Sequence, residues 1–125
     1  MVPDRERYMS LETCRKSGQV VRTPVWFAAA PAGTGAPVLY VYTLADSGKA
    51  KRIRRSRVSR IAPCNARGSV TGPWLDTSAV IVTGVEADRG MRLINRKYWP
   101  WKQVLDLSVL LFHRHERVVI AIRSA

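Results

Sequence analysis

The sequence predicts a mainly β fold: a small, mostly antiparallel barrel with short helices. Three observations predict it. The chain has 125 residues, the length of one domain, so we expect a single domain over residues 1–125. Six strand-like segments cluster without the regular strand–helix alternation that a parallel sheet needs. These strands are rich in valine, and closing them into a barrel would remove exposed edges.

The first three strands are expected at 8–15, 19–30 and 38–43. The first alternates large and small side chains and ends at Lys16-Ser17-Gly18, a composition typical of tight turns. Pro24 lies inside the second strand, where its missing N–H predicts an edge or a bulge. Turn-rich connections between the three segments predict an antiparallel meander.

Helices and three further strands are expected after residue 45. Asp46-Ser47-Gly48 is typical of a helix start, and a short helix is predicted at 49–57. Apolar residues spaced 4, 3 and 4 apart between Ala87 and Tyr98 predict a helix at 86–98. The remaining predicted elements are strands at 58–64, 74–83 and 117–123 and a more apolar helix at 101–112.

The charge balance indicates an anionic partner. Lys and Arg number 21 against 9 Asp and Glu, giving a net charge of +12. Nucleic acid, a membrane surface, or a phosphorylated or polycarboxylate ligand would offset the self-repulsion of this charge. The sequence has no apolar run long enough to span a bilayer and no apolar stretch at 1–10 typical of a signal peptide. We therefore expect a cytoplasmic protein without a membrane span.

The most informative segment is 45–60. Seven of the twelve residues from 49 to 60 are basic: Lys49, Lys51, Arg52, Arg54, Arg55, Arg57 and Arg60. At the predicted helix start, free N–H groups, the Ser47 hydroxyl, close backbone approach at Gly48 and the Lys49 charge would suit a phosphate. On a helix Lys49 shares a face with Arg52 but not with Lys51. A solvated basic face is the alternative interpretation.

Other segments leave the function open. The strand residues 22–26 could lie against a flat ring, and Trp74 could close a pocket. For Trp26 and Trp74, however, packing in the core is the commoner explanation. His113 and His115 lack partners for a metal site, so no metal is expected. No acid/base pair or nucleophile motif is visible, and the catalytic residues stay unassigned. An enzyme of this kind would rely on a cofactor.

Taken together, the segments resemble the pyridoxamine-phosphate-oxidase-like (PPOX class) flavin/deazaflavin oxidoreductases, and within them the actinobacterial branch described as F420-dependent. The resemblance covers nearly the whole chain, from Tyr8 to Ile122, and depends on the order and spacing of its motifs. The motifs are Tyr8-Met-Ser-Leu to Thr13, Arg22-Thr-Pro-Val-Trp-Phe27, Leu39-Tyr-Val-Tyr-Thr43, Ser47-Gly-Lys-Ala-Lys-Arg-Ile53, Ile61-Ala-Pro-Cys64, Arg67-Gly68 and Gly72-Pro-Trp74.

The resemblance implies a six-stranded FMN-binding split barrel that works as a homodimer, acts on a small-molecule substrate and has no nucleic-acid partner. Coenzyme F420, or alternatively FMN, would lie along the strand at 22–26, with its phosphate held by the helix start at 47–49 and by the basic residues after it. The implied cofactor-binding residues are Arg22, Thr23, Pro24, Val25, Trp26, Thr43, Ser47, Gly48, Lys49, Lys51, Arg52 and Trp74.

The sequence leaves three candidate functions. The first is an oxidoreductase that transfers hydride from reduced F420 to an organic acceptor, with FMN as the other cofactor. F420 is preferred because its phosphodiester and oligoglutamate tail suit a surplus of positive charge. The second is a cofactor-binding protein without turnover. The third is a basic barrel that binds nucleic acid, with Tyr40, Tyr42 and Trp26 stacking on bases.

Overall fold

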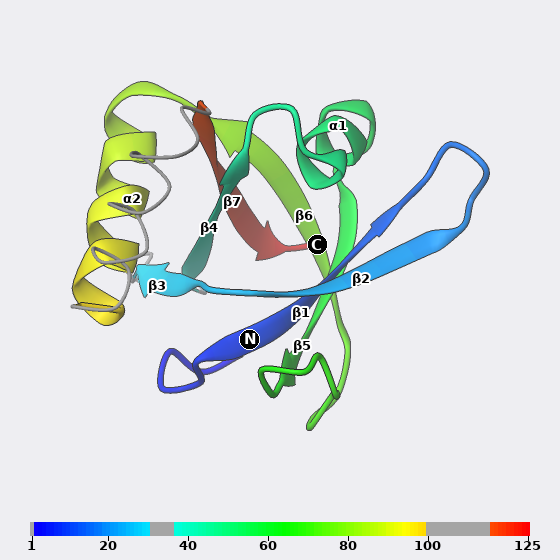
Figure 1. The fold of residues 1–125 in the computed structure, drawn as a ribbon, viewed down its shortest axis with the longest axis horizontal. Helices are drawn as coiled ribbons and strands as arrows, with labels where there is room; N and C mark the ends of the chain where they lie inside the picture. Colours follow the sequence, from blue (N-terminus) through cyan, green and yellow to red (C-terminus); the bar gives the residue numbers. More distant parts are fainter. Residues whose placement is uncertain (1, 31–36, 100–115) are drawn as a thin grey trace.

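The computed structural model describes residues 2–30, 37–99 and 116–125. Its described part is mainly β, with one antiparallel sheet and two helices (Figure 1). The strands are β1 (Tyr8–Cys14), β2 (Val20–Val25), β3 (Ala28–Ala30), β4 (Val38–Leu44), β5 (Val58–Cys64), β6 (Leu75–Val82) and β7 (Arg117–Ser124). The helices are α1 (Gly48–Arg55) and α2 (Gly84–Lys97).

The sheet has seven strands in the order β2-β1-β5-β6-β7-β4-β3, and every neighbouring pair is antiparallel. Its two edges, β2 and β3, follow one another in the chain and are separated only by Trp26 and Phe27. One chain segment therefore connects both edges and holds the sheet in a curl (Figure 1). The single strand expected at 19–30 is divided at this point, while the predicted antiparallel pairing of consecutive segments is confirmed.

Two apolar clusters stabilise the curl. The first fills the inside of the sheet, and its fully buried members include Met9, Leu11, Phe27, Ile61 and Ile120. The second lies between α2 and the outer face of β3, β4 and β7 and is built around buried side chains of both layers: Ala28, Tyr40, Ile94, Tyr98 and Val119. Helix α2 thus covers one side of the sheet, whereas α1 packs against β1, β4 and β6.

Most predicted elements are found close to their expected bounds. The strand at 58–64 has the predicted limits, α1 begins and ends one or two residues early, and α2 begins at Gly84 rather than at 86. The helix predicted at 101–112 lies outside the described residues. Within the described ranges no helix has the length and apolar character that a bilayer crossing requires.

Candidate functional site

Helix α1 starts where the sequence predicted a helix start. Ser47 is its N-cap residue, and the Ser47 hydroxyl oxygen accepts a hydrogen bond from the Ala50 N–H at 3.2 Å. The Thr43 hydroxyl at the end of β4 donates to the same oxygen at 3.0 Å. The helix start is therefore fixed to the sheet through two residues that the resemblance had assigned to cofactor binding.

Two basic side chains of α1 reach across to the first two strands. The Lys49 ammonium donates to the Thr23 hydroxyl of β2 at 3.0 Å, and the Arg52 Nε donates to the Thr13 hydroxyl of β1 at 2.6 Å. The register places Leu11 opposite Thr23, so Thr13 and Thr23 lie on the same face of neighbouring strands. We call this group of four residues, Thr13, Thr23, Lys49 and Arg52, the α1 anion site.

The electrostatics of the α1 anion site favour a negatively charged ligand. Burial lowers the pKa of Lys49, and the positive charge of Arg52 lowers it further. The pKa of Arg52 is also lowered, first by burial and then by Arg15. Within the described ranges neither cation forms an ion pair with a carboxylate. Two partly desolvated like charges without a counter-ion are stabilised by an anion that binds between or beside them.

Gly48 leaves the space in which the Arg52 guanidinium lies. A Cβ at position 48 would be 2.7 Å from the Arg52 Nη1. The sequence suggested that this glycine lets a ligand approach the backbone. The structure shows that its immediate effect is on Arg52, whose side chain folds over the first turn of the helix while Nε bonds Thr13.

The other basic residues of α1 have different roles. Lys51, which the resemblance assigned to the phosphate, is exposed on another face of the helix. Arg54 donates to the carbonyl of Ala45 at 2.8 Å, and Arg55 donates to the carbonyl of Cys14. Only Lys49 and Arg52 of this helix reach the hydroxyl groups of β1 and β2, in agreement with the predicted pairing of these two on one face.

Arg22 and Trp74 belong to a second group, on the opposite face of β1 and β2. The Arg22 Nε donates to Glu12 at 2.7 Å, and the Arg60 Nε lies 3.1 Å from the other oxygen of the same carboxylate. Both guanidinium groups lie over the Trp74 ring, at 4.7 and 5.0 Å from its centre. The sequence interpretation missed Glu12 and Arg60, because their relation to Arg22 depends on the strand register.

The remaining predicted residues of β2 are divided between the core and the surface. Val25 is buried in the inner cluster, and Pro24 is exposed beside the turn that contains Gly68. Trp26 stacks on Tyr98 of the α2 C-cap, with ring centres 4.6 Å apart and planes 8° from parallel. The structure therefore does not bring the twelve predicted site residues together: it gathers Thr23, Thr43, Ser47, Gly48, Lys49 and Arg52 around α1.

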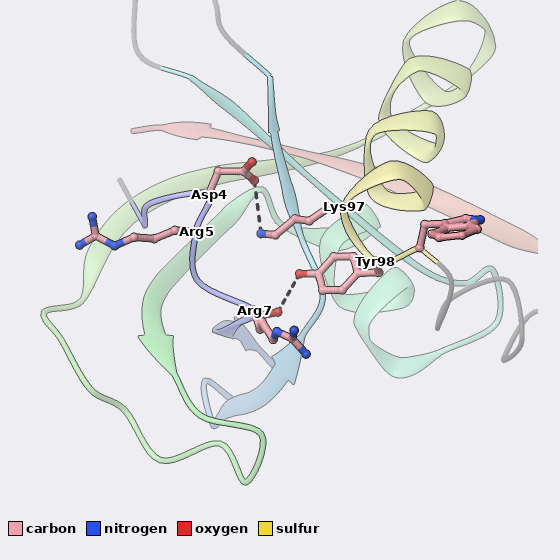
Figure 2. A pocket seen from close by; sticks show the side chains of 6 residues that line it. Asp4, Arg5, Arg7, Lys97 and Tyr98 are labelled. Atoms are coloured by element: carbon pink, nitrogen blue, oxygen red, sulfur yellow. Dashed lines mark hydrogen bonds and ion pairs between the residues drawn. The ribbon is translucent and has the colours of Figure 1, made fainter.

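The end of α2 contacts both the break between β2 and β3 and the N-terminal segment. Figure 2 shows Lys97 pointing toward Asp4 and Tyr98 toward Arg7 of that segment. The Tyr98 hydroxyl accepts from the Phe27 N–H at 3.1 Å and lies 2.7 Å from the Arg7 carbonyl, to which it donates. The Lys97 ammonium donates to the Glu6 carbonyl at 2.7 Å and lies 3.3 Å from Asp4. Burial raises the pKa of Tyr98 and lowers the pKa of Lys97. These contacts fix the N-terminal segment over the break.

The described residues contain no group of three His, Cys, Asp or Glu side chains that could hold a metal ion. Their most buried carboxylate, Glu12, is occupied by two arginines. The α1 anion site presents the cationic donors of Lys49 and Arg52 beside β1 and β2, and such donors suit an anionic group.

Comparison with solved structures identifies the fold. The chain is similar to the conserved hypothetical protein Rv2991 from Mycobacterium tuberculosis, with 21% sequence identity and a TM-score of 0.69 over 97% of this chain and 74% of that one. It is similar to a pyridoxamine 5'-phosphate oxidase-related, FMN-binding protein from Nostoc punctiforme, with 14% identity and a TM-score of 0.54 over 94% and 71% of the chains. An FAD-binding protein from Mesorhizobium loti gives 16% identity and a TM-score of 0.56 over 98% and 83%.

No protein-family model matches the sequence, and the search of curated proteins found no match. At these identities the structural similarities establish the fold, which is the predicted mainly β split barrel. The break lies between β2 and β3, which are the two edge strands of this curled sheet.

Proposed function

We propose that this chain is an oxidoreductase of the PPOX class that holds the phosphate of a flavin-type cofactor in the α1 anion site. The observation that carries the proposal is the pair Lys49 and Arg52, two partly buried cations without a carboxylate partner in the described part of the chain. The solved FMN-binding and FAD-binding proteins of the same fold support it.

The residues present fit a phosphate. Lys49 would supply a point charge, and the Nη groups of Arg52 would supply directed hydrogen bonds, since its Nε is occupied by Thr13. The hydroxyl groups of Thr13 and Thr23 hold the two cations in position. A charge that is already desolvated and fixed loses little on binding, so the site is prepared for its ligand.

We propose coenzyme F420 as the cofactor, with FMN as the alternative. The net charge of +12 suits the several negative charges of F420 better than the phosphate of FMN. The bound cofactor would supply hydride transfer to an organic acceptor. The protein would bind and orient the cofactor, and we assign no residue of this chain as general acid or base. We further propose that the enzyme works as a cytoplasmic homodimer.

The test is a fluorescence titration of the purified protein with F420 and, separately, with FMN, comparing Lys49→Ala with Lys51→Ala. Both variants lose one positive charge, but only Lys49 contacts the anion site. We expect Lys49→Ala to weaken cofactor binding about 10- to 150-fold, the equivalent of ~1.5–3 kcal/mol for a charge-assisted hydrogen bond. Lys51→Ala is expected to bind nearly as the wild type does.

Each outcome of the titration has a definite meaning. Tighter binding of F420 supports the F420 proposal, and tighter binding of FMN replaces it with the alternative. Equal losses in the two variants would show that the α1 anion site is misassigned. Cofactor binding with no turnover of any acceptor would favour a cofactor-binding protein, and no binding of either cofactor would refute the proposal.

A further inference from the structure

A second cationic surface lies on α2, away from the α1 anion site. Arg89, Arg92 and Arg96 follow one another at spacings of three and four residues, which places them on one face of the helix. They line a hollow of about 320 Å³ together with Leu93. All three arginines are exposed.

The face of α2 opposite the three arginines packs against the sheet. Gly90 and Ile94 are buried against the sheet, and a Cβ at Gly90 would be 2.8 Å from the Tyr40 ring. Glu86, the acidic residue of the first turn, is already engaged by Tyr40 and Arg123. In the described ranges no ion pair involves the three exposed arginines.

An exposed aromatic side chain lies just beyond the C-terminal end of α2. Trp99 follows Arg96 by three residues and the Tyr98 C-cap by one, and 69% of its surface is exposed. It is the only aromatic residue among the large exposed hydrophobic side chains of the described ranges. With no partner ring of its own there, its face is open to a planar ligand.

Trp99 also shares a hollow with two arginines of the N-terminal segment. This second hollow, of about 250 Å³, is lined by Trp99 together with Arg5 and Arg7 (Figure 2). Arg5 extends away from Lys97 and Tyr98 in this view. The one carboxylate in the lining, Asp4, is compensated by Lys97 and accepts from the Ala29 N–H. We call the set Arg5, Arg7, Arg89, Arg92, Arg96 and Trp99 the α2 basic band.

We propose that the α2 basic band binds single-stranded nucleic acid, with the arginines on the phosphates and Trp99 stacked on a base. From Arg89 to Arg96 the helix rises about 10.5 Å, a length over which one stacked strand presents about three phosphates. A row of cations beside an exposed ring is the arrangement that holds unpaired strands without reading their sequence. Of the strand aromatics considered from sequence, Tyr40 is buried, Trp26 is stacked on Tyr98, and Arg117 lies over the Tyr42 ring at 5.3 Å.

This inference departs from the expectation, drawn from the family resemblance, that nucleic acid is not a partner. It does not depend on the proposed cofactor function, because no residue of the band belongs to the α1 anion site. A preference for single strands over duplex follows from Trp99, since a paired base offers no free face to stack on.

The experiment measures fluorescence anisotropy of a labelled oligothymidylate of about 20 nucleotides as full-length protein is added at several salt concentrations. The test variant carries Arg89→Gln, Arg92→Gln and Arg96→Gln. Glutamine keeps a high helix propensity, so α2 is expected to remain folded, which circular dichroism checks. The matched control carries Lys16→Gln, Arg57→Gln and Arg67→Gln, three exposed residues elsewhere, and has the same net charge.

In the test variant we expect the slope of log K against log salt to become shallower by about 2, since each phosphate contact on a single strand contributes about 0.7. The control should change it by less than half as much. Trp99→Leu should weaken single-strand binding about 5- to 140-fold and reduce the preference over a duplex of equal length.

Three results would overturn the proposal. One is an equal loss of affinity in the two triple variants, which would reduce the binding to general charge. Another is the absence of binding at about 0.15 M salt. The third is stronger, band-dependent binding to vesicles containing phosphatidylserine than to the oligonucleotide, which would assign the band to a membrane surface. If the triple variant is unfolded, single Arg→Gln variants apply the same criterion, each lowering the slope by about 0.7.

Discussion

Gly48 determines where the Arg52 guanidinium lies, and a single methyl group tests this. We predict that Gly48→Ala leaves the stability of the fold nearly unchanged, because the obstructing atom is the flexible end of a side chain and alanine is favourable in a helix. Its cofactor affinity should fall about 10-fold or more, ~1.5 kcal/mol, because Arg52 must move away from its position. Urea unfolding and the fluorescence titration measure the two effects separately.

The Gly48 prediction has an internal control in a double-mutant cycle. In an Arg52→Gln background the added methyl group has no guanidinium to displace, so Gly48→Ala should then cause little further loss of affinity. Additive losses in the double variant would mean that the methyl group acts on the ligand itself. That result would restore the interpretation made from sequence, in which Gly48 lets the ligand approach the backbone.

At the residue scale, the structure separates residues that the sequence had grouped in one site. Residues 22–26 were assigned to the cofactor as a block, although neighbouring residues of a strand point to opposite faces. Thr23 accordingly contacts Lys49, whereas Arg22 contacts Glu12 on the other face. The spacing of Lys49 and Arg52 is a local helical property and was predictable. The contribution of Thr13 was not, because it depends on how α1 docks against β1.

At the scale of elements, the divided strand is stabilised by one hydroxyl group. Tyr98→Phe would leave the buried Phe27 N–H without its hydrogen-bond acceptor while keeping the ring stacked on Trp26. We predict a loss of ~1–3 kcal/mol in the free energy of unfolding, measured with urea. Tyr8→Phe is the matched control, because no hydrogen bond of the Tyr8 hydroxyl is found in the described part of the structure.

The same variant separates structure from binding. The α1 anion site shares no residue with the break between β2 and β3, so Tyr98→Phe should keep the cofactor affinity of the wild type. If the two Tyr→Phe variants had equal stability, the Tyr98 hydroxyl would not be holding the strand break. A large loss of cofactor affinity in Tyr98→Phe alone would show that the break and the α1 anion site are coupled.

The elements themselves were well predicted because their signals are local. Strand composition and the turn residues on either side predicted 58–64 with its observed limits, and the Ser47 cap predicted the start of α1. The division between β2 and β3 could not be predicted in this way. It depends on Phe27 bonding Tyr98, a residue 71 positions later in the chain. Pro24 suggested an irregular strand, but it lies within β2 and not at the break.

At the scale of the whole molecule, the net charge predicted an anionic partner without saying where it binds. The basic residues of the folded chain include three kinds. Some are neutralised, as Arg22 and Arg60 are by Glu12. Others are brought together and partly buried, as Lys49 and Arg52 are. The α2 basic band stays exposed. The second kind changes the response of folding to pH through its own burial, because its pKa values are displaced.

That displacement predicts how stability changes with pH. The pKa of Lys49 is lower in the folded protein than in the unfolded chain, so the folded state binds this proton less tightly. Below the folded pKa both states are protonated and Lys49 is destabilising in full. As the pH rises through the folded pKa toward 10.5, the folded state releases the proton first and stability increases. The melting temperature of the wild type should therefore rise relative to Lys49→Met over this alkaline range.

The comparison with Lys49→Met removes the other titrating groups from the argument. Lys97, Tyr40 and Tyr98 also have displaced pKa values, but they are present in both proteins and cancel in the difference. An anion bound beside Lys49 favours its charged form, so saturating phosphate should raise the wild-type melting temperature at neutral pH more than that of Lys49→Met. It should also reduce the alkaline gain. Parallel pH curves for the two proteins, with equal responses to phosphate, would mean that Lys49 is solvated as an ordinary surface lysine and that the α1 anion site does not attract anions.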